Sequence, residues 1–189
     1  MSLNENIAVI DTETTFDDDV MSIGVVIADS KSFHVRDRLY LLVDPFYRMP
    51  AMFSSAIFHG NVKADGIVKR KEAIERIKSF MEKNSADSFF AYNGRFDKAH
   101  LPEISHYPWY DIMRVAAYRQ FNSWIGPDVP CCKTGRMKYG YSVEEIYHMI
   151  SGKRTYSEVH NALTDAEDEL KIMEMLGNDI SVYEIAKIN

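Results

Sequence analysis

The chain has 189 residues, of which 46% are hydrophobic and 26% charged, and its formal net charge is −6. A chain of this length and composition is expected to form one globular domain over residues 1–189. The negative charge argues against a protein that coats nucleic acid through an overall basic surface, so any contact with nucleic acid must be local.

The cysteines and the N-terminal segment indicate the compartment. Cys131 and Cys132 are adjacent, a spacing that suits neither a disulfide framework nor a CxxC zinc site, so we expect a reducing compartment. The opening MSLNEN lacks the basic region and apolar core of a secretion signal, and the longest apolar run, Val20 to Ala28, is too short to span a membrane. We therefore expect a soluble, cytoplasmic protein without a membrane partner.

The first half of the chain predicts a mixed sheet. Ile7 to Glu13, Val20 to Ala28 and Arg36 to Val43 read as strands separated by short polar turns, which favours an antiparallel meander. Residues 70–83 place apolar side chains at helical spacing, with charges on the other face. The apolar run at residues 88–93 follows that helix and is expected to return parallel to an earlier strand. An α/β layered fold follows.

The second half predicts further helices. Residues 110–121 read as a short strand that runs into a helix, and an unusually long loop follows. Ser142 and Glu145 have the spacing of a capping box ahead of an amphipathic helix. A last helix is expected from about Leu163 to Leu176, and Gly177 is placed to end it.

Asp11 and Glu13 stand at the end of the first predicted strand. Side chains on a strand alternate between faces, so both carboxylates must point the same way. Each raises the pKa of the other, so the pair needs a cation, basic partners or simple exposure at the end of the strand. Divalent cations such as Mg²⁺ prefer oxygen ligands of this kind. Solvated acids at a strand tip would look the same, so this motif alone is weak.

Two further segments carry acids. Asp97 falls at the predicted start of the helix after residues 88–93, where complementing the helix dipole would explain it equally well. His160 precedes Asp165 by five residues, which on one helix would leave the side chains about 140° apart. Both can face one site only if His160 lies in the loop or cap before the helix. A solvated cap histidine and a first-turn acid are the alternative.

Taken in order, type and spacing, Asp11, Glu13, Asp97, His160 and Asp165 resemble the three motifs of the DEDDh 3′–5′ exonucleases. This DnaQ-like family includes the proofreading subunit of bacterial DNA polymerase III. The resemblance spans about residues 7–176. The tyrosine variant of the superfamily would need Tyr four residues before the last Asp, where this chain has Asn.

Weaker similarities and one departure accompany these motifs. Residues 56–61, AIFHGN, resemble the family's short His-Gly segment, and residues 110–118 resemble its Asp-led strand-to-helix segment. The first motif of the family usually continues with Thr-Gly and an apolar residue, whereas here Thr15 and Phe16 follow Thr14. Phe16 could supply a stacking surface, although an aromatic residue at a strand end is more often part of the core.

The resemblance implies an RNase H-like fold, with a five-stranded mixed sheet of three antiparallel and then parallel strands flanked by helices. It also implies two Mg²⁺ or Mn²⁺ ions. Asp11 would be shared between them, Glu13 and Asp165 would complete one site, and Asp97 would serve the other. His160 would be the general base, a role that suits an imidazole. The implied reaction is hydrolysis from the 3′ end of single-stranded DNA or short RNA, releasing nucleoside 5′-monophosphates.

The sequence predicts the contacts with the substrate less specifically than the acidic cluster. The residues expected to bind substrate are Thr14, Thr15, Phe16, Phe58, His59, Asn93 and Arg95. The resemblance implies the contacts of Phe58 and His59, where a buried aromatic residue and a turn histidine would look the same. Arg95 stands beside Asp97, in a good position for a phosphate, and solvation on the helix surface explains it equally well.

Basic residues and tyrosines occur together over residues 131–141, and two more basic residues follow at Lys153 and Arg154. Phosphate contacts and base stacking use these residue types, and a solvated basic loop with packed tyrosines explains them equally well.

Three readings compete. The first is a free-standing exonuclease. The second is a non-catalytic nucleic-acid-binding or assembly module of a replication or repair complex that keeps the exonuclease fold, with a DNA polymerase among the partners that this reading allows. The third, an α/β domain with coincidental acids, requires five residues to match by chance. The choice between DNA and RNA and the oligomeric state, with a dimer among the options, stay open.

Overall fold

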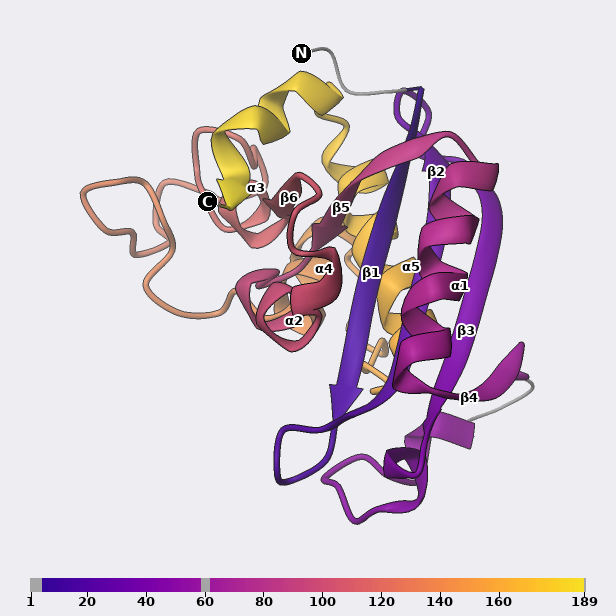
Figure 1. Cartoon of the computed structure of the whole chain (residues 1–189). Coiled ribbons are helices and arrows are strands. Elements are labelled where there is room, and N and C mark those ends of the chain that lie inside the picture. The colour runs from indigo at the N-terminus through magenta and orange to yellow at the C-terminus, as the bar shows by residue number, and fades with distance from the viewer. Residues whose placement is uncertain (1–4, 59–61, 189) are drawn as a thin grey trace.

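The computed structural model of the protein describes residues 5–58 and 62–188, and a seven-stranded sheet lies at its centre (Figure 1). The strands are β1 (Asn6–Thr14), β2 (Val20–Asp29), β3 (Val35–Asp44), β4 (Gly66–Lys69), β5 (Ala86–Ala91), β6 (Trp109–Asp111) and β7 (Lys187–Ile188). The α-helices are α1 (Arg70–Lys83), α2 (Arg95–His100), α3 (Met113–Ala116), α4 (Val143–Ser151) and α5 (Ala162–Leu176). The 3-10 helices are η1 (Phe46–Arg48), η2 (Ala56–Phe58), η3 (Pro102–Ile104) and η4 (Ile180–Ala186).

The strand order is β4-β3-β2-β1-β5-β6-β7. Strands β1, β2 and β3 form the expected antiparallel meander, and β5 pairs parallel with β1 and with β6. The expectation of five strands is wrong, because β4 adds to β3 at one edge and β7 adds to β6 at the other. Both additions are short, with four and two residues, which is too few to show an alternation of apolar and polar side chains.

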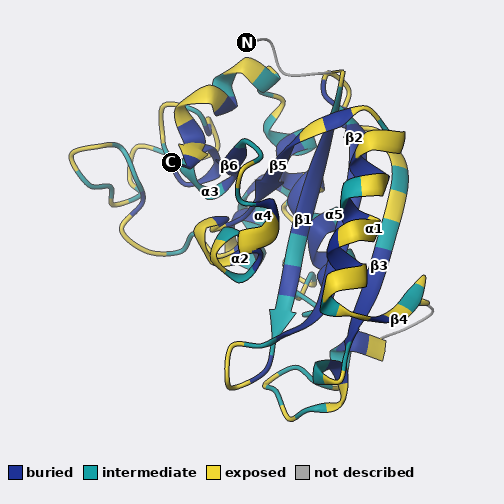
Figure 2. Ribbon diagram, viewed as in Figure 1, coloured by how far each residue is buried: buried dark blue, intermediate teal, exposed yellow. Residues whose placement is uncertain are grey.

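Helices cover both faces of the sheet, as the expected α/β layering requires. Helix α1 packs on the face that presents Ala8 and Ile10 of β1, whereas α5 packs on the face that presents Ile7 and Val9. Figure 1 shows α1 in front of the strands and α5 behind them, and Figure 2 shows the central strands buried between these layers. The C-terminal end of β1 therefore lies close to helices of both layers.

The helix boundaries follow from local chemistry. Ser142 and Glu145 form the reciprocal capping box of α4. Helix α5 starts at Ala162, behind its N-cap Asn161, and ends at Gly177, whose φ of 66° is in the left-handed region that glycine adopts readily. The helix expected within residues 110–121 is reduced to the short α3.

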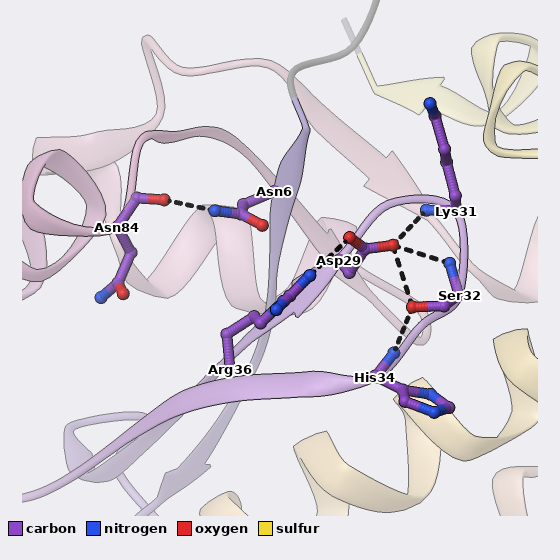
Figure 3. A network of polar contacts seen from close by, with 7 residues as sticks. All are labelled: Asn6, Asp29, Lys31, Ser32, His34, Arg36 and Asn84. Carbon is purple, nitrogen blue, oxygen red and sulfur yellow. Dashed lines mark hydrogen bonds and ion pairs between the residues drawn. The ribbon is translucent and has the colours of Figure 1, made fainter.

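The β2–β3 hairpin is held by one carboxylate. Asp29 accepts hydrogen bonds from the backbone N–H groups of Lys31 and Ser32 and from the Ser32 hydroxyl, and it pairs with Arg36 at 2.9 Å (Figure 3). These donors, led by Ser32, hold the pKa of Asp29 well below its ordinary value. The hairpin lies at the end of the sheet away from the tip of β1 (Figure 1).

Within residues 5–58 and 62–188, no helix combines the length and the apolar composition that crossing a bilayer would require.

Candidate active site

Two acidic side chains stand near the end of β1. Asp11 pairs with Gly24 in the β1–β2 ladder, and Glu13 follows two residues later. Because side chains alternate along a strand, both carboxylates lie on the same face as Val9, which is the face that α5 covers. The register of the ladder shifts after Glu13, between it and Thr14. The regular pairing of β1 with β2 therefore ends at Glu13.

Gly24 allows helix α5 to approach this point. A Cβ atom added to Gly24 would lie 2.2 Å from the carbonyl oxygen of Ala162, the first residue of α5. Only a residue without a side chain can occupy this position while the helix keeps its place. Since Gly24 pairs with Asp11, the close approach brings the first turn of α5 to the acidic end of β1.

Asp97 enters from helix α2 and is only 2% exposed. Its Oδ1 accepts hydrogen bonds from the backbone N–H and the hydroxyl of Thr12, at 3.0 and 2.8 Å. Thr12 lies between Asp11 and Glu13 and belongs to the opposite face of β1. Asp97 is thus hydrogen-bonded to the residue of β1 that lies between the other two acids.

His160 and Asp165 reach the site from the two sides of a helix cap. His160 lies in the loop just before the N-cap Asn161, with a left-handed φ of 60°, and Asp165 is in the first turn of α5. This is the arrangement that the five-residue spacing required for both to face one site. Ligand atoms of Glu13, His160 and Asp165 all lie within 4.8 Å of one another.

Asn161 fixes the position of this cap. Its side chain is fully buried, accepts a hydrogen bond from the backbone N–H of Thr164, and donates to the Tyr40 hydroxyl and to the Ala56 carbonyl. The loop that carries His160 is therefore attached to β3 and to η2. The ring of Phe53, which precedes η2, stacks on the imidazole with ring centroids 3.5 Å apart.

The pKa values of the acids are shifted because the carboxylates are crowded together and partly removed from water. Burial is the main cause of every shift, and neighbouring carboxylates add to it. The pKa values of Glu13 and Asp165 are each raised to about 8, and that of Asp97 to about 7. The pKa of Asp11 is raised well above its ordinary value by burial and then by Asp97. Burial lowers the pKa of His160, so its imidazole is neutral at neutral pH.

The donor set fits divalent cations. Oδ2 of Asp11 and Oδ1 of Asp165 are buried and accept no hydrogen bond from the described residues. A buried carboxylate oxygen without a donor is costly unless a cation compensates it. Oxygen atoms of converging carboxylates are the ligands that Mg²⁺ and Mn²⁺ prefer. The residues present could therefore hold such ions.

One acid of this cluster was not expected from the sequence. Glu169 lies one helical turn after Asp165 on α5, is 3% exposed and accepts a hydrogen bond from the backbone N–H of Tyr92 at 3.0 Å. Burial and then the charge of Asp97 raise its pKa well above the ordinary value. The spacing of four residues from Asp165 was the available signal, because such pairs share a helix face.

The residues expected to bind substrate occupy different settings. Phe16 and Phe58 are 68% and 59% exposed, and Asn93 and Arg95 are exposed around the start of α2. Thr14 is half-buried at the end of β1. The hydroxyl of Thr15 instead accepts hydrogen bonds from two backbone N–H groups of its own turn. His59 lies outside the described residues.

The basic loop at residues 131–141 projects from the edge of the molecule beside α3 (Figure 1). Lys133, Lys138 and Tyr139 are exposed, and the guanidinium of Arg136 lies over the ring of Tyr141 at 5.6 Å from its centroid. The exposed basic side chains fit both sequence interpretations of this loop, and the contact between Arg136 and Tyr141 fits the packed tyrosines of the second.

Comparisons with known proteins identify the fold. No protein-family model matches the sequence, and no curated protein matches it. Solved structures do match. A 3′-exonuclease in a structure of 3′-end recognition of a histone mRNA stem-loop has a TM-score of 0.65 and 16% identity, covering 92% of this chain and 64% of that one. This chain therefore spans less than two thirds of that structure.

Two further structures match over nearly their whole length. The nuclease domain of 3′hExo bound to rAMP, described as a DEDDh family member, has a TM-score of 0.63 and 14% identity, with 90% of each chain covered. Exonuclease X in complex with 5′ overhanging duplex DNA has a TM-score of 0.58 and 20% identity, covering 95% of this chain and 99% of that one. The chain thus has the fold of the DEDDh 3′-exonucleases, which confirms the resemblance inferred from the sequence motifs at the level of the fold.

Proposed function

We propose that the chain is a metal-dependent 3′–5′ exonuclease that acts as a single domain on single-stranded DNA or short RNA. The observation that carries the proposal is the convergence of five side chains from separate elements at one end of β1, within an exonuclease fold. These are Asp11 and Glu13 of β1, Asp97 of α2, His160 of the preceding loop and Asp165 of α5.

The acids would hold two Mg²⁺ or Mn²⁺ ions, with Glu13 and Asp165 at one, Asp97 at the other and Asp11 at both. When bound, a pair of such ions activates a water, orients the scissile phosphate and stabilises the leaving 3′ oxygen. Thr12 keeps the carboxylate of Asp97 in place through its two hydrogen bonds. Supporting the assignment, buried oxygens of Asp11 and Asp165 have no other partner among the described residues.

His160 would act as the general base. Its imidazole is neutral at neutral pH and can take a proton from the attacking water as the new oxygen–phosphorus bond forms. The bond between phosphorus and the 3′ oxygen of the preceding nucleotide breaks in the same displacement, and that oxygen takes up a proton from solvent to become a 3′ hydroxyl. The products would be a nucleoside 5′-monophosphate and a strand that is one nucleotide shorter.

Exposed aromatic rings support a single-stranded end as the substrate. Phe16 and Phe58 extend from the two segments that follow β1 and β3. Unpaired bases stack on such rings without a strong sequence preference. The matching structures contain both RNA and DNA, so the nucleic acid is left to experiment.

The test is a cleavage assay with 5′-labelled DNA and RNA of one sequence in Mn²⁺, comparing the wild type with Asp97→Asn and His160→Gln. Asp87→Asn is the matched control, because Asp87 is an exposed acid at the opposite end of β5 from Asp97. A ladder that shortens from the 3′ end, is lost in both site variants and survives in the control would support the proposal. Retained binding without cleavage by the wild type would favour the non-catalytic module instead.

A further inference from the structure

Glu169 brings a fifth carboxylate to the acidic cluster. It follows Asp165 by four residues on α5, so both side chains lie on the buried stripe of the helix. At 3% exposure Glu169 is as deeply buried as Asp165 and Asp97. The exonuclease mechanism proposed above uses the other acids and leaves Glu169 without a role.

The hydrogen bond of Glu169 links two elements of the site. Its Oε2 accepts from the backbone N–H of Tyr92 at 3.0 Å, directly after β5 and five residues before Asp97. Helix α5, which carries Asp165, is thereby connected to the turn that leads into α2, which carries Asp97. Among the described residues, no cationic side chain forms an ion pair with Glu169.

A hydrogen bond from one backbone amide does not account for a buried negative charge. A glutamine side chain could accept the same hydrogen bond and would avoid the repulsion from neighbouring carboxylates. The buried oxygens of Asp11 and Asp165 that accept no hydrogen bond lie in the same cluster. The buried charge of Glu169 and the unpaired oxygens of Asp11 and Asp165 both become favourable when a cation binds in the cluster. The reason is that the interaction of a carboxylate with a divalent cation is strong in a poorly solvated site.

We propose that Glu169 supplies negative charge that tightens the binding of divalent cations at the cluster of Asp11, Glu13, Asp97 and Asp165. This inference rests on the proposed function, since it requires that function's cations. Glu169 is a positioning residue, and it acts through the electrostatic field at the site while its hydrogen bond keeps the carboxylate next to β5. The four other acids balance the charge of two divalent ions, and Glu169 adds one negative charge beyond that balance.

The test measures Mn²⁺ binding by calorimetry and by thermal unfolding at one pH, with and without EDTA. Glu169→Gln keeps an acceptor for Tyr92 and removes the charge. We expect Mn²⁺ to bind about tenfold more weakly to this variant, and we expect its melting temperature in EDTA to exceed that of the wild type. Glu169→Asp retains the charge on a shorter side chain and should keep the affinity within about threefold of the wild type.

Glu167→Gln is the matched control. It removes one negative charge from the same helix at a half-exposed position that pairs with Arg38. This variant should bind Mn²⁺ like the wild type. Equal Mn²⁺ affinity in the wild type and Glu169→Gln would overturn the inference and leave Glu169 as a structural link. A wild type whose melting temperature does not respond to Mn²⁺ would overturn the proposed metal-dependent function as well.

Discussion

The ring of Phe53 lies flat against the imidazole of His160, with centroids 3.5 Å apart and ring planes at 15°. The two residues come from segments more than a hundred positions apart in the chain. His160 occupies a left-handed backbone conformation in a loop, and Asn161 anchors that loop to η2 through its hydrogen bond to the Ala56 carbonyl. The stack therefore fixes the plane of the proposed general base from the segment that follows β3.

Phe53→Ala is expected to reduce the rate of cleavage about tenfold, because a loosely held imidazole is less often in reach of the attacking water. Binding of Mn²⁺ should be unchanged, since the carboxylates stay in place. The measurement is single-turnover cleavage together with a Mn²⁺ titration of the same variant.

Met52→Ala is the control for this prediction, because Met52 is the neighbouring residue and is mostly exposed. It should cleave at the rate of the wild type. A Phe53→Ala enzyme with an unchanged single-turnover rate would show that the stack does not position His160.

Gly24→Ala is expected to lower the free energy of unfolding by about 1–3 kcal/mol and to reduce cleavage. The new methyl group would meet the Ala162 carbonyl at 2.2 Å, so either β2 or the start of α5 must shift. Because Asp165 lies in that first turn, the shift would also separate Asp165 from Asp11. Urea unfolding and the cleavage assay measure the two effects.

Gly126→Ala is the matched control, since an added Cβ at Gly126 would meet nothing within 4 Å. Its free energy of unfolding should stay within about 0.5 kcal/mol of the wild type. Equal stability of the Gly24→Ala and Gly126→Ala variants would contradict the proposed close approach.

Much of this arrangement could be predicted from local sequence patterns. The alternation of a strand places Asp11 and Glu13 on one face, and the angle per residue of a helix requires His160 to lie outside α5. Both rules describe neighbours within a single element. They hold here because the pairing of β1 with β2 is regular as far as Glu13, and because α5 has a well-defined cap at Asn161.

What the sequence did not predict depends on contacts between distant elements. Glu169 looks like an ordinary helical acid until its contact with Tyr92 is seen, and Phe53 meets His160 only through the path of the loop after β3. The role of Gly24 depends on the close approach of α5, which the sequence of β2 does not predict. The edge strands β4 and β7 were missed for a different reason, namely that they are too short to carry a pattern.

The stability of the metal-free protein should fall as the pH rises from 6 to 8. Glu13 and Asp165 have pKa values raised to about 8 and Asp97 to about 7, against ordinary values of about 4. The folded form therefore binds more protons than the unfolded form between pH 4 and 8, and this contribution to stability is lost as these groups ionise. The melting temperature in EDTA should drop over this range.

Mg²⁺ should flatten that dependence, because a bound divalent cation compensates the ionised carboxylates and stabilises only the folded form. The comparison is a series of melting curves from pH 6 to 8 in EDTA and in Mg²⁺. Parallel curves, with no additional stabilisation by Mg²⁺ at the higher pH, would contradict the account of the cluster.

Asp29→Asn tests an acid outside the site whose pKa is shifted in the opposite direction. The pKa of Asp29 is lowered, so its ionised form stabilises the hairpin above the unfolded-state pKa of about 4, and this stabilisation is lost as the pH falls further. The variant should melt below the wild type at pH 7, and the gap should shrink between pH 4 and 2. A gap that is constant from pH 7 to 2 would rule out this role for the charge.

The most direct test of the central claim is the chemical identity of the first product. A single-stranded oligonucleotide with a different base at each end is incubated with the protein and Mg²⁺, and the released fragments are identified by mass spectrometry. The proposed site predicts that the first product is the 5′-monophosphate of the 3′-terminal nucleoside. The Asp11→Asn variant should not release this product. Release from the 5′ end, internal fragments, products with a 3′-phosphate, or no cleavage at all would contradict the assignment of Asp11, Glu13, Asp97, His160 and Asp165 as a 3′–5′ exonuclease centre.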